Sequence, residues 1–273
     1  MKDFPEGAPC WADAMFRDAA GAKRFYGEVL GWTFGGAATE YGNYTQAYSD
    51  GKAVAAIVPP MPGGDDMPSA WCLYLATSDA AATAEKIKAA GGNVLMEPMR
   101  VGEFGTMLLA QEPSGAVFGC WQPGEHRGFE KMGENGAYAW AEVFTRDPDR
   151  ADAFLQQVFP YAAQRMEPGD DPAEAGMDFK VFSVPGAEQP VLGRLRMGED
   201  FPPEVPPYIQ VYFTVPDCDA AVAKARELGG TLYFGPMDSP FGRFAAIADP
   251  QGAAFAVIDM STTAGEMPEM SEA

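Results

Sequence analysis

The sequence predicts an α+β protein of two tandem modules, each built from paired βαβββ units that form a curved mixed sheet around a concave pocket, with helices on the outer face. The chain has 273 residues, which suits two domains better than one. An internal repeat divides it into two similar halves, and each half holds two strand-to-helix junctions. The 31 Gly and 24 Pro are typical of many turns between short strands.

The repeat is read directly from two sets of residues. Trp11-Ala12-Asp13 returns as Trp140-Ala141-Glu142, 129 residues later. Near the end of each half, Glu112-Pro113-Ser114-Gly115 returns as Asp249-Pro250-Gln251-Gly252, 137 residues later. The same elements therefore occur twice in the same order, which indicates a duplication with a small difference in length.

This duplication sets the predicted domain boundaries. The modules are expected at residues 8–122 and 136–259. Residues 123–135 begin with a polar run rich in Pro and Gly, which predicts a linker. Residues 260–273 carry Glu and Met without periodicity, so we expect a disordered acidic tail.

Four aspartates mark the expected helix starts. An Asp after a strand-like run can accept hydrogen bonds from the free amides of the first helical turn. Each is followed by 12 or 13 residues rich in Ala, Lys and Glu, and then by a Gly or Pro suited to stop a helix. The four predicted helices follow Asp18, Asp79, Asp147 and Asp217 and stop by Gly31, Gly91, Pro160 and Gly229.

Charge and composition exclude several functions. With 39 acidic and 19 basic residues the net charge is −20, which would repel phosphate backbones and anionic lipids. We therefore expect no nucleic-acid partner and no membrane partner. The first residues lack an apolar stretch behind Lys2, and no window approaches the run of about 20 apolar residues that spans a bilayer. A cytoplasmic protein is expected.

Cysteine and histidine usage excludes further chemistry. The four cysteines lie far apart without a CxxC pair, so neither a zinc ribbon nor a disulfide framework is indicated. The one histidine, His126, falls in the predicted linker. A Ser-His-Asp or Cys-His centre needs a base beside its nucleophile, so these classes are not supported.

Strand alternation predicts which side chains face the pocket. In the first strand it places Trp11, Asp13 and Met15 opposite the helix, and the same parity applies to the related strands. Aromatic walls with a few polar groups are typical of small-molecule sites. The alternative is that the tryptophans fill the concavity or the contact between modules. The predicted ligand-binding residues are Trp11, Asp13, Met15, Cys72, Tyr74, Trp121, Trp140, Glu142, Phe144, Gln210 and Tyr212.

Asp13 and Glu142 are the candidate catalytic residues. They recur at matching positions facing inward, where an unpaired buried carboxylate is costly. An ion pair with an arginine would remove this cost and give the two carboxylates a structural role. Without a partner their pKa would rise, and either could act as a general acid or base. The basic residues considered as partners are Arg100, Arg194, Arg196 and Arg243.

These motifs resemble the vicinal-oxygen-chelate superfamily of glyoxalases, bleomycin-resistance proteins and extradiol dioxygenases. The resemblance rests on Asp18, Phe25-Tyr26-Gly27, Leu30-Gly31-Trp32 and the Asp249-Pro250-Gln251-Gly252 turn, and it covers almost the whole chain. It implies the paired βαβββ fold. It leaves the function open, because the family includes metal-dependent isomerases, dioxygenases, thiol transferases and metal-free drug-binding proteins.

The resemblance also implies where a metal would bind. The metal enzymes of the family place His, Gln or Glu at the pocket-facing start of first strands and a Glu near the end of the strand after the Asp-Pro-x-Gly turn. Among the corresponding residues only Cys72 and Gln210 could bind a metal, so we expect no metal and no cofactor. Asp13, Glu142, Glu103 and Gln210 remain as possible oxygen ligands in another arrangement. The corresponding residues are Trp11, Cys72, Trp140, Gln210, Gly119 and Ala256.

The leading prediction is metal-independent binding, or sequestration, of a small apolar or aromatic metabolite or drug by a monomer or homodimer. The alternative is a glyoxalase- or dioxygenase-type enzyme with an unusual metal set or with acid–base chemistry through Asp13 or Glu142. A third possibility is a module that associates with another protein, in which case its own side chains would fill the concave faces.

Overall fold

A computed structural model describes residues 3–60, 68–167 and 177–272. Four βαβββ units follow one another along the chain, each as a strand, a helix and three further strands. The first two units are β1 (Pro9–Met15), α1 (Ala19–Leu30), β2 (Thr33–Phe34), β3 (Thr45–Ser49) and β4 (Lys52–Val58), then β5 (Trp71–Ala76), α2 (Ala80–Ala89), β6 (Asn93–Val101), β7 (Gly105–Gln111) and β8 (Val117–Pro123). The last two are β9 (Tyr138–Thr145), α3 (Pro148–Val158), β10 (Ala162–Met166), β11 (Phe179–Ser183) and β12 (Leu192–Arg196), then β13 (Tyr208–Thr214), α4 (Cys218–Glu227), β14 (Thr231–Met237), β15 (Arg243–Ala248) and β16 (Ala254–Asp259).

Each pair of units forms one mixed sheet. The first sheet has the order β2-β3-β4-β1-β5-β8-β7-β6. The second has the order β14-β15-β16-β13-β9-β12-β11-β10-β17, in which β17 is the short strand Met270–Glu272. β1 lies antiparallel to β5 and parallel to β4, and β9 lies antiparallel to β13 and parallel to β12. The predicted α+β fold of two tandem modules is confirmed; the first sheet is called module 1 and the second module 2 below.

All four helices start as predicted. The carboxylates of Asp18, Asp79, Asp147 and Asp217 accept hydrogen bonds from the backbone amides three residues further on, at 2.8, 3.0, 3.3 and 2.9 Å. These bonds satisfy donors that the helix leaves free in its first turn. The helix N-termini are thus fixed by local sequence.

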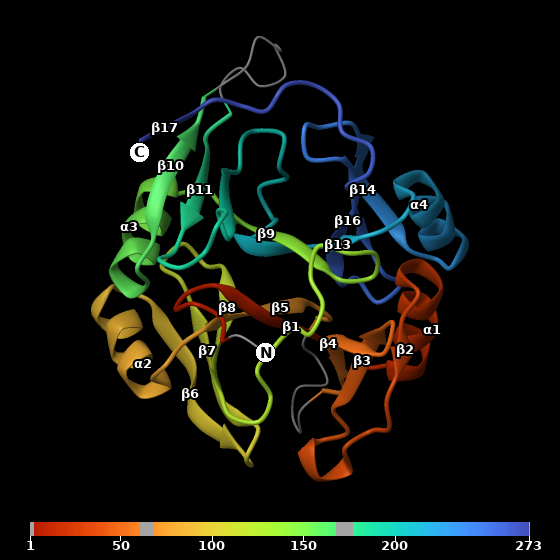
Figure 1. The fold of residues 1–273 in the computed structure, drawn as a ribbon, viewed down its shortest axis with the longest axis horizontal. Coiled ribbons are helices and arrows are strands. Elements are labelled where there is room, and N and C mark those ends of the chain that lie inside the picture. The colour runs from red at the N-terminus through yellow and green to blue at the C-terminus, as the bar shows by residue number, and fades with distance from the viewer. Residues whose placement is uncertain (1–2, 61–67, 168–176, 273) are drawn as a thin grey trace.

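The two sheets pack back to back. In Figure 1 the central strands of the modules lie against each other across the middle of the molecule, and the outer strands bend away from this contact. α1 contacts α4 on one side and α2 contacts α3 on the other. The rings of Trp32 and Trp71 meet Phe213 at 5.2 and 5.0 Å, and Nε1 of Trp32 donates to the carbonyl of Gly136 at 2.7 Å. These two tryptophans, neither of which is a predicted pocket residue, therefore fill the contact between the modules.

The chain after β8 folds back onto module 1 before it enters module 2. The amide of Phe129 donates to the carbonyl of Cys10 at 2.7 Å, and the amide of Glu130 donates to the carbonyl of Ala53 at 2.9 Å. The Phe129 ring stacks on Tyr138 at 4.9 Å and is 3% exposed. The segment expected to be a linker is therefore packed against both modules.

The expectation of a disordered tail is wrong for its last part. Residues Met270–Glu272 form β17, which pairs antiparallel with β10 at the edge of the second sheet. An exposed edge strand offers free amides and carbonyls to any extended segment within reach, which explains the pairing. Among the helices of the described residues, none is long and apolar enough to cross a membrane.

Candidate functional site

The predicted module 1 residues share the concave face of the first sheet. Trp11 lies opposite Tyr74, Asp13 opposite Cys72, and Tyr74 opposite Gly119 on β8. Asp13 and Met15 are partly exposed, whereas their neighbours Ala12 and Ala14 face the buried side. The strand alternation used to predict this face is confirmed. The face comprises Trp11, Asp13, Met15, Cys72, Tyr74 and Trp121.

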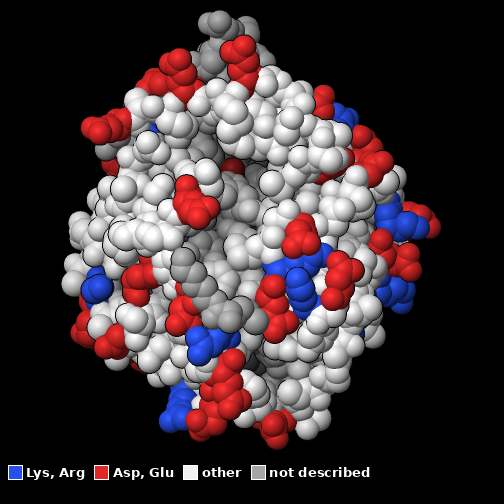
Figure 2. All heavy atoms as spheres, in the orientation of Figure 1, with Lys and Arg blue, Asp and Glu red and all other residues white. Residues whose placement is uncertain are grey.

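The module 2 residues form an equivalent face. Gln210 lies opposite Glu142 on the neighbouring strand, with Tyr212 opposite Trp140 and Tyr208 opposite Phe144. Trp140 and Glu142 are partly exposed, and Gln210 is only 3% exposed. In Figure 2 the surface of module 2 is hollowed on this side of the molecule, and acidic side chains are spread over the rest of the view.

The structure does not combine the two faces into one site. Each face lies on the side of its sheet that points away from the other module, because the opposite sides make the back-to-back contact. The chain therefore carries two separate candidate sites, one on each module.

Among the described residues, the carboxylate of Glu142 accepts hydrogen bonds from neutral donors only. The Tyr212 hydroxyl donates to Oε2 at 2.8 Å, and Nε1 of Trp140 donates to Oε1 at 3.1 Å. Burial raises the pKa of Glu142 to about 7, and the two hydrogen bonds offset only part of that rise. Glu142 is thus near half ionised at neutral pH.

Asp13 has the same character in module 1. The Tyr44 hydroxyl lies 3.5 Å from Oδ2 of Asp13 and accepts a hydrogen bond from Nε1 of Trp11 at 2.6 Å. Burial raises the pKa of Asp13 to about 7, and hydrogen bonds from Tyr74 and Tyr44 lower it in part. Sequence reasoning missed Tyr44, because it precedes β3 and lies outside the strands whose alternation was used.

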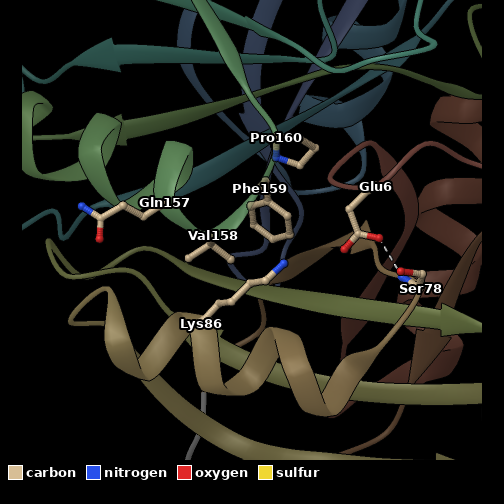
Figure 3. A pocket seen from close by; sticks show the side chains of 7 residues that line it. All are labelled: Glu6, Ser78, Lys86, Gln157, Val158, Phe159 and Pro160. Atoms are coloured by element: carbon tan, nitrogen blue, oxygen red, sulfur yellow. Dashed lines mark hydrogen bonds between the residues drawn. The ribbon is translucent and has the colours of Figure 1, made fainter.

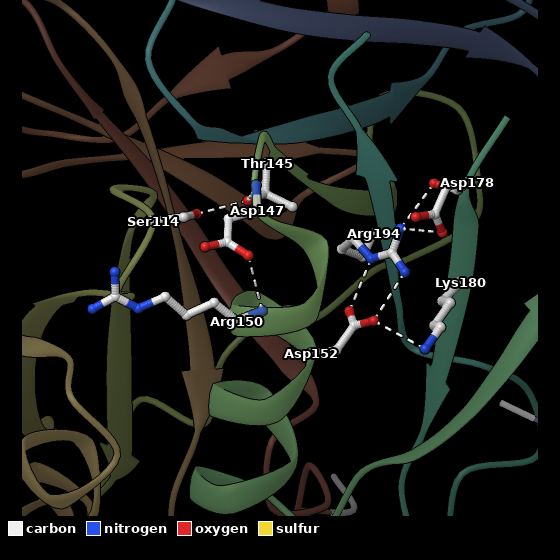
Figure 4. Close-up of polar contacts among 8 residues, drawn as sticks. All are labelled: Ser114, Thr145, Asp147, Arg150, Asp152, Asp178, Lys180 and Arg194. Carbon is white, nitrogen blue, oxygen red and sulfur yellow. Dashed lines mark hydrogen bonds and ion pairs between the residues drawn. The ribbon is translucent and has the colours of Figure 1, made fainter. Parts of the chain in front are cut away.

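Three of the four arginines considered as partners form ion pairs with other carboxylates. Arg194, 1% exposed, binds both carboxylate oxygens of Asp152 at 2.8 and 2.9 Å and Oδ1 of Asp178 at 2.8 Å, as Figure 4 shows. Arg100 pairs with Glu103, and Arg243 pairs with two aspartates near its own strand. Within the described part of the chain, no ion pair reaches Asp13 or Glu142, so the alternative of a structural role through pairing with an arginine is not supported.

Aromatic rings missed by the sequence analysis extend the module 2 face. Phe144 stacks on Tyr208 at 4.8 Å and meets Phe201 edge-on at 5.7 Å. Tyr212 meets Phe244 at 6.2 Å, and Phe244 meets Phe234 at 6.0 Å. Tyr208 could have been found, because it shares the alternation of Gln210 and Tyr212. The other rings come from more distant strands and loops.

The module 1 face is partly covered by the segment after β8. The His126 ring lies 4.3 Å from the Trp11 ring and 5.6 Å from the Trp121 ring, and Nε1 of Trp121 donates to the His126 carbonyl at 2.8 Å. Phe129 packs on Trp11 at 5.6 Å. Burial lowers the pKa of His126 to about 4, so its ring is neutral at physiological pH.

The residues present do not fit the metal centre that the resemblance implies. Indole rings at Trp11 and Trp140 offer no ligand atom, and Gly119 and Ala256 lack a side chain that could coordinate. A Cβ added at Gly119 would lie 2.3 Å from the Tyr74 ring, so that ring occupies the space a side chain there would need. In the ranges that the structure describes, no group of three His, Cys, Asp or Glu could hold a metal ion.

A cleft at the junction of the modules lies away from both carboxylates. It has a volume of about 520 Å³ and is lined mainly by ends of helices and loops, and Figure 3 shows Glu6 accepting a hydrogen bond from the Ser78 amide beside it. It contains none of the predicted site residues, and its Lys86 and Gln157 are exposed side chains. We therefore place the candidate sites on the concave faces. The cleft is lined by Glu6, Ser78, Lys86, Gln157, Val158, Phe159 and Pro160.

The fold and these two concave faces place the chain in the class of tandem βαβββ proteins. Within that class, the chain belongs to the Glyoxalase/Bleomycin resistance protein/Dioxygenase superfamily, whose sequence profile matches residues 11–119. The family expected from the motifs is thus confirmed.

Two relatives match along nearly their whole length. "Putative glyoxylase CFP32" of Mycobacterium tuberculosis is 37% identical over 260 residues, which cover 94% of this chain and 96% of that one. "Anthracycline biosynthesis protein DauV" of Streptomyces sp. (strain C5) is 36% identical over 277 residues, covering 95% and 96%. The crystal structure of the Mn(II)-bound glyoxalase from Novosphingobium aromaticivorans matches in fold, with a TM-score of 0.61 at 16% identity over 96% of this chain and 87% of that one.

Proposed function

We propose that the protein binds a small apolar or aromatic molecule without a metal ion, on the concave face of a module, with Asp13 or Glu142 contacting its polar groups. The observation that carries the proposal is the combination of a partly exposed carboxylate with aromatic walls. Glu142 lies among Trp140, Phe144 and Tyr212, and it accepts hydrogen bonds from the neutral donor groups of Trp140 and Tyr212. Sites for small organic molecules have this composition.

Aromatic walls favour a planar ligand. Stacked and edge-on rings around Tyr208, Phe144 and Phe244 offer flat apolar surfaces, and each aromatic contact of this kind contributes about 0.5–1.5 kcal/mol beyond area burial. One relative is described as an anthracycline biosynthesis protein, which is consistent with a polycyclic aromatic ligand in that protein. The monomeric or homodimeric state and the cytoplasmic location stay predictions.

A second candidate function is an acid–base enzyme of glyoxalase or dioxygenase type. The observation that favours it is the pKa of about 7 shared by Asp13 and Glu142, since a general acid or base works best near the operating pH. Either carboxylate could then remove a proton from a bound substrate or return one to it. The first candidate explains the aromatic walls as well, and we prefer it.

Elemental analysis and native mass spectrometry of freshly purified protein test whether the site works without a metal and whether it retains an organic molecule. We expect no stoichiometric divalent metal and an additional organic mass on part of the chains. One divalent ion per chain, lost on substitution of Gln210, Glu142 or Asp13, would overturn the metal-independent proposal and point to an enzyme.

A further inference from the structure

Gln210 carries a polar group that the protein leaves unsatisfied. Its side chain is 3% exposed, and among the described residues its Nε2 has no hydrogen-bond partner. Burying an amide without a hydrogen-bond partner destabilises a protein, so native proteins usually satisfy such a group or use it. Gln210 shares the concave face with Tyr208 and Tyr212, so its amide belongs to the face proposed to bind a ligand.

Glu142 supplies hydrogen-bond acceptors beside the donor of Gln210. It lies directly opposite Gln210 on the neighbouring strand, where side chains on one face are about 5 Å apart. A carboxylate has about four acceptor sites, and Tyr212 and Trp140 use two of them. Among the described residues, the buried Nε2 of Gln210 is thus an unpaired donor beside a carboxylate with free acceptor sites, and aromatic rings lie around both.

We propose that each chain holds one ligand, on module 2, and that this ligand is a planar aromatic molecule with an acceptor for Gln210 and a donor for Glu142 side by side on one edge, as in an aromatic lactam. The inference rests on the proposed function and adds the ligand class and the module. The aromatic walls receive the ring faces, and the lactam edge satisfies both polar side chains at once.

Module 1 lacks the same pair. The residue opposite Asp13 is Cys72, whose thiol is a weak donor and already lies 3.8 Å from the Leu73 carbonyl. His126 and Phe129 cover Trp11, which is 3% exposed, whereas its counterpart Trp140 is partly exposed. The duplication has therefore left the donor and acceptor pair on one module only.

Calorimetric titration of the full chain with 2-quinolone at pH 8 tests the inference. We expect one site per chain. The probe 1-methyl-2-quinolone keeps the carbonyl but loses the N–H donor, so it should bind about tenfold more weakly. Gln210→Leu should weaken 2-quinolone binding by a similar factor, because the carbonyl loses its donor. Gln157→Leu, on the exposed face of α3, is the matched control and should change nothing.

Glu142→Leu completes the test. In this variant the difference between 2-quinolone and its N-methyl derivative should disappear, since the acceptor for the N–H is gone. Two sites per chain, equal affinity of the wild type for both probes, or no binding of 2-quinolone would each overturn the inference. The proposed function is tested separately by native mass spectrometry, which detects any retained organic molecule. A retained molecule together with no binding of 2-quinolone would overturn the ligand class and leave the proposed function standing.

Discussion

The Tyr212 hydroxyl donates to Oε2 of Glu142 at 2.8 Å, from β13 to the adjacent β9. A phenol solvates the carboxylate without bringing a positive charge, so burial still raises the pKa of Glu142 to about 7. The same relationship recurs between Tyr44 and Asp13 in module 1. Each module therefore holds an acid that changes its charge near neutral pH.

Glu142→Gln should change the pH dependence of stability. The folded pKa of Glu142 is above the unfolded value of 4.5, so the wild type loses stability as pH rises from about 4.5 to about 7. Relative to wild type, the variant should gain about 2 to 3 kcal/mol between pH 4.5 and pH 8. Urea unfolding at the two pH values measures this. The exposed Glu28→Gln serves as control, and an equal pH slope in Glu142→Gln and wild type would contradict the prediction.

Tyr212→Phe should raise the pKa of Glu142 further, because the lost hydrogen bond stabilises the ionised form. A pH titration of carboxyl ¹³C resonances in glutamate-labelled protein reports the value, and Glu142→Gln assigns the signal. Tyr233→Phe, at a residue that is 62% exposed, should leave it in place. A lowered or unchanged pKa in Tyr212→Phe would show that the hydroxyl does not stabilise the carboxylate.

Arg194→Met should destabilise module 2 strongly. Arg194 neutralises the buried Asp152 together with Lys180, and removing it leaves that carboxylate with one cation. Breaking a buried ion pair by removing one partner costs about 3–5 kcal/mol. Chemical denaturation measures the loss. Arg150→Met, on the exposed surface of α3, should cost far less, and similar losses in the two variants would argue against this role.

Phe213→Ala should destabilise both modules together. Its ring is fully buried between Trp32, Trp71 and Phe255, so the cavity left behind should cost about 3–5 kcal/mol. Because the core is shared, we expect calorimetry to show one unfolding transition at a lower temperature. The exposed Phe241→Ala should have little effect. Two separate transitions in the wild type would mean that the modules are stable independently.

Local patterns explain what could be predicted about the site. Alternation along β1 and β9 was enough to place Trp11, Asp13, Trp140 and Glu142 on the concave faces. It was not enough to find Tyr44, because that residue reaches Asp13 from the segment just before β3. Strand alternation also did not indicate that Arg194 would form an ion pair with Asp152, since this pair joins a strand to a helix 42 positions earlier in the chain.

The sequence by itself determined the duplication, the four Asp-capped helices and the face on which each strand residue lies, because these features follow from short-range periodicity and from caps within a few residues. Only the tertiary structure decided that no ion pair among the described residues reaches Asp13 or Glu142, that His126 and Phe129 cover Trp11, and that β17 extends the second sheet. Those outcomes depend on which segments distant in sequence come into contact, and local residue spacing does not determine such contacts.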